Sequence, residues 1–265
     1  MPALHFSTDR YRALVLGSAL LLLQGPALIA QSPALSGAAR WADTVRVTIE
    51  RAVISGSTSE LVAAGALAER ALTAFPNDAL LLHYRAYGLY REAQRDQSRG
   101  PAWKAMTERA IELLERSAAS QPLPETQALL SSTLGMLASG SMVAGMRYGS
   151  ASKEAGAAAS ALGPRNPRVL LLAAISSWFT PKMWGGGEDK GYAMMQRAIT
   201  EFANDAPARP LPAWGHAEAY AWLGQMELKR GNAAAASGAY AKALELEPGY
   251  AWVSQVLMPA VAARQ

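Results

Sequence analysis

The sequence predicts an all-α fold of stacked helix pairs, an α-solenoid, and three observations support this. Hydrophobic residues make up 51% of the 265 positions, and many of them are alanine, the strongest helix former. Long alternating runs of Val, Ile and Thr, which would indicate strands, are absent. Related patterns recur about every 34 residues, a period typical of helical repeats. We expect about five helix pairs, at 43–76, 79–122, 123–164, 167–203 and 217–250, and a closing helix over 251–263.

The first two pairs are predicted from signals that begin and end helices. Ser57 and Glu60 form a capping box at the start of the second helix of the first pair. Pro76 follows that helix and ends it, because proline cannot continue the hydrogen-bond ladder. Pro101 fits the first turn of another helix, and Pro122 ends it. The order of signals is therefore the same in both pairs.

The third and fourth pairs follow the same order less regularly. Pro164 marks the end of the third pair. The apolar segment Arg168–Thr180 is predicted to be the first helix of the fourth pair, and Glu188–Phe202 its partner. Met195 and Ala198 are expected on the packed side of that partner helix, since they lie three residues apart.

The clearest repeat is the last, which spans 34 residues from Ala217 to Tyr250. Gly224 and Ala236 are small enough for two helices to approach closely, and Pro248 ends the second helix. Its marker residues are Tyr220, Leu223, Gly224, Gly231, Ala236, Tyr240, Ala243 and Pro248. This order resembles the tetratricopeptide repeat (TPR). The resemblance implies a helical repeat domain, which we place at 41–265.

The N-terminus has the features of an export signal. Arginines precede an apolar run of 11 residues, Ala13–Leu23, which is too short to span a bilayer comfortably. A break follows, and the segment 27–30 (Ala-Leu-Ile-Ala) offers a cleavage site after Ala30, although Leu28 is larger than usual at the third position before the cut. We therefore expect a signal peptide over 1–30, a flexible linker over 31–40, and a periplasmic or secreted protein. The alternative is an uncleaved signal anchor, which would be the protein's only contact with a membrane.

Composition and missing motifs exclude several functions. The formal net charge is +4, but Lys and Arg are scattered among acidic residues, so we expect no binding to nucleic acid. The sequence has no cysteine, which excludes disulfides and thiolate metal sites. Beyond His5, only His83 and His216 remain, outside any metal-spacing motif. Walker A, His-Glu-x-x-His and Gly-x-Ser-x-Gly patterns are missing. We expect no catalytic residue, no metal and no cofactor.

Two short motifs have both a chemical and a structural interpretation. Ser150 and Lys153 match the Ser-x-x-Lys of penicillin-recognising enzymes, but the companion motifs are absent, which favours chance. The glycines Gly185–Gly187 precede a helix and could bind an anion through their N–H groups. Acidic residues follow at once and would repel an anion. We therefore favour a tight turn with Trp184 packed across it, and binding by the loop stays open.

Three further segments carry a second resemblance. They are the segments at 166–169 (Asn-Pro-Arg-Val), at 180–190 around the glycine loop and at 212–215 (Pro-Ala-Trp-Gly). Over roughly residues 155–250 they resemble a family of exported bacterial TPR proteins. This resemblance implies a periplasmic or secreted repeat protein without established chemistry. A looser similarity, to the periplasmic TPR-like T component associated with TRAP transporters, implies a small ligand or a transporter partner.

The first helices of TPR units usually line a concave groove, which predicts where binding occurs. The expected groove residues are His83, Tyr87, Tyr90, Arg168, Trp178, Trp184, Glu218 and Gln225. Aromatic and aliphatic side chains suit a peptide or helix, so we expect a non-enzymatic scaffold that binds a protein or peptide partner. The alternatives are that these side chains belong to the core, or that a closed pocket lined by Trp and Arg binds a small ligand for a transporter.

Overall fold

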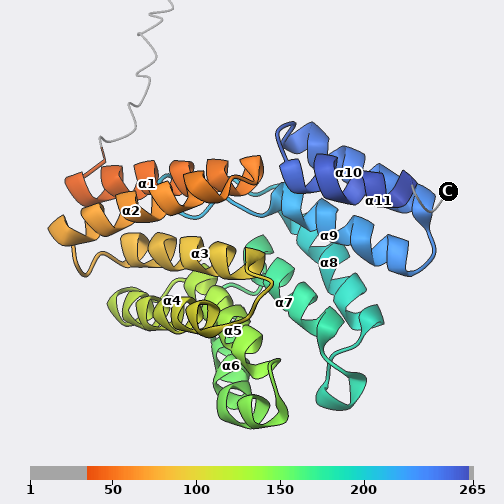
Figure 1. Cartoon of the computed structure of the whole chain (residues 1–265), viewed down its shortest axis with the longest axis horizontal. Helices are drawn as coiled ribbons and strands as arrows, with labels where there is room; N and C mark the ends of the chain where they lie inside the picture. Colours follow the sequence, from red (N-terminus) through yellow and green to blue (C-terminus); the bar gives the residue numbers. More distant parts are fainter. Residues whose placement is uncertain (1–34, 263–265) are drawn as a thin grey trace, which may run out of the picture. The chain divides into compact units, whose positions relative to one another are not determined.

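The computed structural model describes residues 35–262, and Figure 1 shows them as a succession of helices packed side by side. The described residues contain no strand, so the predicted fold class is confirmed. The predicted signal peptide over 1–30 lies outside the described residues. The helices are α1 (Gly37–Ser55), α2 (Thr58–Ala74), α3 (Ala79–Arg95), α4 (Pro101–Ser120), α5 (Pro124–Ala138), α6 (Met142–Leu162), α7 (Pro167–Phe179), η1 (Lys182–Trp184), α8 (Glu188–Phe202), α9 (His216–Lys229), α10 (Ala233–Leu246), η2 (Trp252–Leu257) and α11 (Met258–Ala262).

Successive helices pack as five hairpins, from α1 with α2 to α9 with α10, as the sequence predicts. The first helices of neighbouring hairpins also contact one another: α1 packs on α3, and α5 packs on α7. Each hairpin thus buries its apolar side against its neighbours, which is how a solenoid forms one core. Across residues 35–262, no helix has the length and apolar character needed to cross a membrane.

The start of the predicted domain needs correction, whereas its closing helix is present but irregular. Helix α1 begins at Gly37, so the linker expected over 31–40 is already helical in its last four residues. The cause is Ser36, whose side chain accepts a hydrogen bond from the N–H of Ala39 and caps the helix. The closing helix is irregular: the π-helical turn η2 precedes α11, where Pro259 lacks the N–H that an α-helix would use.

Small residues let the hairpin helices approach, as expected for the last pair. A Cβ atom at Gly224 would lie only 2.2 Å from the ring of Tyr240, so any larger residue would push α9 and α10 apart. The ends of the described unit also meet, since Ile54 at the end of α1 packs against the cluster around Tyr250 and Val253. The first and last hairpins are therefore neighbours.

Candidate functional site

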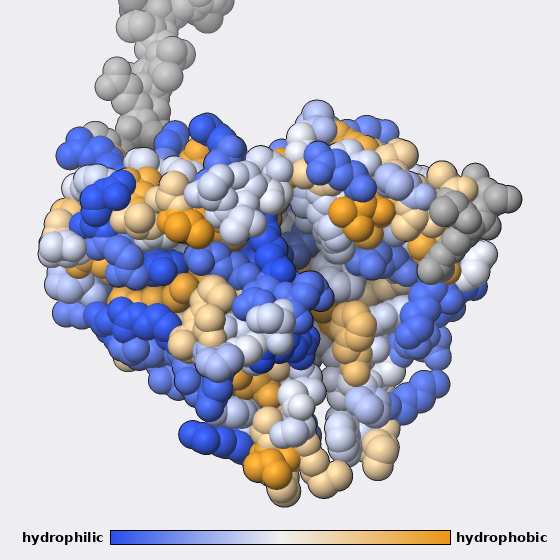
Figure 2. Space-filling model, viewed as in Figure 1, coloured by the Kyte–Doolittle hydropathy of each residue, from blue (hydrophilic) through white to orange (hydrophobic). Residues whose placement is uncertain are grey.

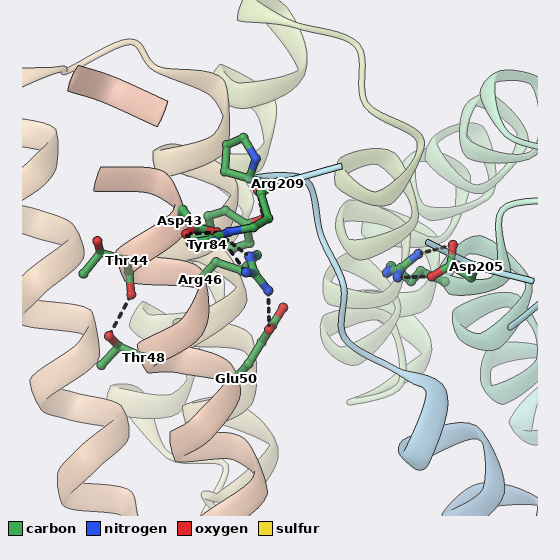
Figure 3. Close-up of polar contacts among 10 residues, drawn as sticks. Asp43, Thr44, Arg46, Thr48, Glu50, Tyr84, Asp205 and Arg209 are labelled. Carbon is green, nitrogen blue, oxygen red and sulfur yellow. Dashed lines mark hydrogen bonds and ion pairs between the residues drawn. The ribbon is translucent and has the colours of Figure 1, made fainter. Parts of the chain in front are cut away.

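The connection between α8 and α9, residues 203–215, crosses the side of the first helices where a groove was expected (Figure 3). We call these residues the crossing segment. The guanidinium of Arg209 donates to Asp43 of α1, with Nε 3.0 Å from Oδ2. The hydroxyl of Tyr84 in α3 donates to the carbonyl oxygen of Pro210 at 2.5 Å. The segment is thus fixed to two first helices through its middle.

Charges line up beneath the crossing segment. The Arg209 guanidinium, with help from Arg46, lowers the pKa of Asp43 and keeps it ionised. Arg46 lies 2.8 Å from Asp43 and also 2.8 Å from Glu50, one turn further along α1 (Figure 3). Burial raises the pKa of Glu50, because a carboxylate loses its hydration there. The result is an alternating row of Arg209, Asp43, Arg46 and Glu50.

Both ends of the crossing segment are also held. Asp205 receives two hydrogen bonds from Arg168 of α7, at 3.2 and 2.5 Å, a bidentate geometry that fixes both groups. At the other end, Trp214 stacks on Tyr87 with ring centroids 5.0 Å apart and planes 14° from parallel. The segment therefore occupies the inner face, by which we mean the side chains of Asp43, Arg46, Glu50, Tyr84, Tyr87 and Arg168.

The predicted groove residues do not form a free groove. Six of the eight are buried in the described structure, namely His83, Tyr87, Tyr90, Arg168, Trp178 and Glu218. Tyr87 and Arg168 contact Trp214 and Asp205 of the crossing segment, and the other four pack against neighbouring helices, so the expectation of an open groove needs correction. Trp184 is 65% exposed and Gln225 is half-buried. Binding by these two side chains stays a prediction.

The buried polar members of this set have partners within the chain, although Nε2 of His83 and Nε of Arg168 are buried without a hydrogen-bond partner among the described residues. Glu218 of α9 pairs with Arg91 of α3, whose guanidinium also donates to the hydroxyl of Tyr87 at 3.0 Å. The ring of His83 lies 3.0 Å from the hydroxyl of Thr126, and burial lowers its pKa to about 3. His83 is thus neutral at ordinary pH, and it is a core residue. Across residues 35–262 no group of three potential ligands could hold a metal ion.

A first cleft, of about 200 Å³, lies between α1, α3 and the start of α9. We call it the α1–α9 cleft. Trp214 and Arg91 line it, which is the residue pair expected of a small-ligand pocket. Arg91 is already committed to Glu218, and Trp214 to Tyr87. Nε1 of Trp214, Nε of Arg91 and Oε1 of Glu50 are nevertheless buried without a hydrogen-bond partner among the described residues, so this cleft keeps some unpaired polar groups.

A second cleft, of about 250 Å³, separates the third and fourth hairpins. We call it the α6–α8 cleft. Its charged lining residues are Lys153 of α6 and Lys190 of α8, and no Asp or Glu lines it. Serine and threonine hydroxyls complete the polar part, and the floor includes Val169 and Leu172 of α7. The cleft thus combines cationic walls with an apolar floor.

The glycine loop borders this second cleft but does not offer its amides. The N–H groups of Gly185, Gly186 and Gly187 donate to the carbonyl oxygens of residues 182, 181 and 177, at 2.9, 3.3 and 2.8 Å. A Cβ at Gly186 would lie 2.3 Å from the carbonyl oxygen of Thr180, so the turn requires glycine there. The tight-turn interpretation is confirmed. Trp184 is exposed and not packed across the turn, so that detail was wrong.

Exposed apolar side chains lie at the start of α6 and around the α7–α8 turn, and one of them, Trp184, lines the α6–α8 cleft. They are Met142, Val143 and Met146 on α6, and Phe179, Met183 and Trp184 around the α7–α8 turn. Met142, Met146 and Lys153 share one face of α6, because they are spaced by one and two helical turns, and Lys153 lines the cleft. Figure 2 shows apolar colour at the lower end of the surface, where Figure 1 places the start of α6 and η1.

The sequence interpretation missed the crossing segment. It also missed the exposed apolar side chains at the start of α6 and around the α7–α8 turn, which we call the apolar rim. One signal was present: the connection over 203–215 is long for a helical repeat and contains three prolines, which favour an extended chain. Its partners could not be found locally, because Arg209 and Asp43 are 166 residues apart. The apolar residues of the rim do not recur at a regular spacing, so nothing in the sequence distinguishes them from core residues.

Comparison with known proteins supports the fold. No protein-family model and no curated protein matches the sequence. A thermophilic TPR protein of Thermus thermophilus, TTC0263, superposes with a TM-score of 0.56 at 20% identity, covering 85% of this chain and 96% of that one. The HusA haemophore from Porphyromonas gingivalis also reaches 0.56, at 23% identity, covering 74% and 96%. The chain therefore has a TPR-like α-solenoid fold.

Proposed function

We propose that the protein is a non-enzymatic scaffold that binds a protein or peptide partner along the α6–α8 cleft. The observation that carries this proposal is the apolar rim beside a cleft that the chain itself leaves open. Exposed apolar clusters of this kind mark interaction sites on soluble proteins. The TPR-like fold agrees with a scaffold role, since helical repeats present extended binding surfaces. The partner site thus moves from the predicted inner groove to the neighbouring cleft.

The residue types at the rim suit a peptide. Methionine is flexible and polarisable, so Met142 and Met146 can adapt to several apolar side chains. Trp184 offers a large surface at low entropic cost, and tryptophan is enriched in binding hot spots. An extended segment lying over the cleft would cover these side chains and remove them from water.

The test uses truncation of the rim. Random peptides displayed on phage are selected on the protein, and their affinities are then measured for Met146→Ala/Trp184→Ala. We expect at least roughly ten-fold weaker binding, because a hot-spot truncation costs about 2 kcal/mol or more. Val62→Ala is the matched control, since Val62 is an exposed apolar residue on α2, outside the cleft. Equal binding by wild type and the double variant would overturn the proposal.

We also propose that the protein is exported. The support is the charged, apolar and small-residue order of residues 1–30. N-terminal sequencing of the periplasmic or secreted fraction should give a chain that begins close to residue 31. A membrane-bound form that still begins with Met1 would make the uncleaved anchor correct.

A second candidate function is binding of a small ligand in the α1–α9 cleft, as an accessory of a transporter. The observation that favours it is the lining by Trp214 and Arg91. A thermal-shift screen with small organic compounds tests it. A compound that raises the melting temperature of the wild type, but not of a variant with Val53→Trp filling the cleft, would support this function. Stabilisation of both proteins alike would contradict it.

A further inference from the structure

The lysines of the α6–α8 cleft are unusual for this chain because no carboxylate neutralises them. Lys153 makes no ion pair or hydrogen bond within residues 35–262, and Lys190 donates only to the carbonyl oxygen of Gly185, at 2.7 Å. Each of the other four lysines pairs with a carboxylate, as Lys242 does with Glu245 at 2.5 Å. Two cations on opposite walls of one cleft therefore lack counter-charges.

The acidic residues nearest in sequence to these two lysines interact with other side chains. Glu154 accepts a hydrogen bond from Ser150, on another face of α6 from Lys153. Glu188 pairs with Lys229 at 2.6 Å, and Asp189 pairs with Arg230 at 3.2 Å. These carboxylates are therefore paired outside the cleft, and the two lysines are its only charged lining residues in the described structure.

The apolar and cationic parts are arranged in one line. On α6 the face runs from Met142 through Met146 to Lys153, over about three turns. A Cβ added at Gly149, between them, would meet no atom within 4 Å, so this stretch of the face is open. Across the cleft, Trp184 lies six residues before Lys190. Lys153, Lys190 and Trp184 therefore line one cleft, and Met146 continues the face of α6 that carries Lys153.

We propose that the occupant of the α6–α8 cleft is an acidic peptide segment, in which a carboxylate lies between Lys153 and Lys190 and an adjacent bulky apolar side chain packs on Met146 and Trp184. The proposal rests on the proposed function and names the chemistry of its partner. The opposite charges of peptide and cleft favour their association and fix the orientation of the peptide. The apolar contact adds affinity because it removes apolar surface from water. The hydroxyl of Ser176, which lines the same cleft, can hydrogen-bond to the peptide backbone, and the Thr180 hydroxyl, which donates to the carbonyl oxygen of Ser176, can still accept.

The experiment compares peptides that differ only in charge. Peptides selected on the wild-type protein are sequenced, and the tightest is remade with every Asp and Glu replaced by Asn and Gln. We expect enrichment of acidic residues next to bulky apolar ones, and at least roughly ten-fold weaker binding of the neutral copy. The double variant Lys153→Gln/Lys190→Gln should lose the preference for the acidic copy, and added salt should reduce wild-type binding. Lys104→Gln, which changes an exposed side chain of α4 outside the cleft, is the control and should leave peptide binding unchanged.

The outcomes separate the two proposals. Peptides that depend on Met146 and Trp184, but bind equally well in acidic and neutral form, would overturn this inference and leave the scaffold function standing. Peptides that bind the wild type and Met146→Ala/Trp184→Ala with equal affinity would overturn both the scaffold function and this inference. A third arm uses vesicles of phosphatidylcholine with phosphatidylglycerol. Binding to the vesicles through the two lysines, without any peptide preference, would replace the peptide by an anionic lipid surface and overturn the inference.

Discussion

The inner face and the α6–α8 cleft are both formed where neighbouring hairpins meet, yet the chain treats them in opposite ways. On the inner face, Asp43 is paired with Arg209 and Arg46, and Arg168 is paired with Asp205. In the cleft, the two lysines have no carboxylate. A charge that the chain satisfies itself stabilises the fold and leaves nothing for a partner, whereas an unsatisfied exposed charge is available for recognition. The comparison explains why the inner face serves the fold, and it supports the proposal that the cleft is the binding surface.

The largest expected effect is on the free energy of unfolding, and it distinguishes two buried aromatic residues from the exposed Trp184. Tyr87→Ala and Trp178→Ala should each reduce the free energy of unfolding by about 3–5 kcal/mol, as for other large core aromatics. Trp184→Ala should change it by less than about 0.5 kcal/mol, because this side chain is mostly in solvent. Urea unfolding measures all three. Normal stability of Tyr87→Ala would show that the inner face is a free surface after all.

A smaller effect concerns pH. Burial, and then the charge of Arg168, lower the pKa of His83 from 6.5 to about 3 in the folded protein. Below pH 6.5 His83 therefore binds a proton in the unfolded chain but stays neutral in the folded one. As the pH is lowered, the free energy of unfolding should fall by up to about 1.4 kcal/mol per pH unit.

Urea unfolding between about pH 7 and 5, either side of the ordinary pKa of histidine, tests this, with His83→Gln compared with the wild type. The variant should lose stability less steeply over that interval. His216→Gln is the matched control, since His216 is only half-buried, although its pKa is lowered in the same direction by burial. Equal pH slopes for wild type and His83→Gln would contradict a neutral, buried His83.

The smallest expected effect is local. Arg209→Ala removes the contact between the middle of the crossing segment and Asp43, so residues 203–215 should become several-fold more susceptible to proteolysis while the melting temperature changes little. Arg165→Ala is the matched control, because Arg165 is also an exposed arginine but pairs with Glu201 outside the crossing segment. Cleavage that is unchanged in Arg209→Ala would show that this ion pair does not hold the segment.

The parts of the fold that were predictable are those set by nearby residues. The last hairpin follows from Gly224 and Tyr240, whose ring leaves room only for glycine. Helix ends followed from prolines and caps, and they were accurate except where Ser36 extends α1. These signals act within one or two turns of helix, so one sequence carries them.

The candidate site was much less predictable. Register identified which side of each first helix Tyr87 and Trp178 occupy, but it could not show that another segment covers that side. The contact between Tyr84 and Pro210 joins residues 126 positions apart and leaves no local pattern. Trp184 was expected against the turn, whereas the amides of the turn bond to nearby carbonyl oxygens without it. Occupation of a surface by a distant part of the chain needs the structure.

Hydrogen exchange of the protein, with and without a selected peptide, tests the central claim most directly. If binding uses the α6–α8 cleft, the peptide should slow exchange at the start of α6 and over 179–190, and leave residues 203–215 unchanged. If the inner face is the binding site, the crossing segment must leave it. Faster exchange over 203–215 together with slower exchange in α1 and α3 would therefore contradict the account.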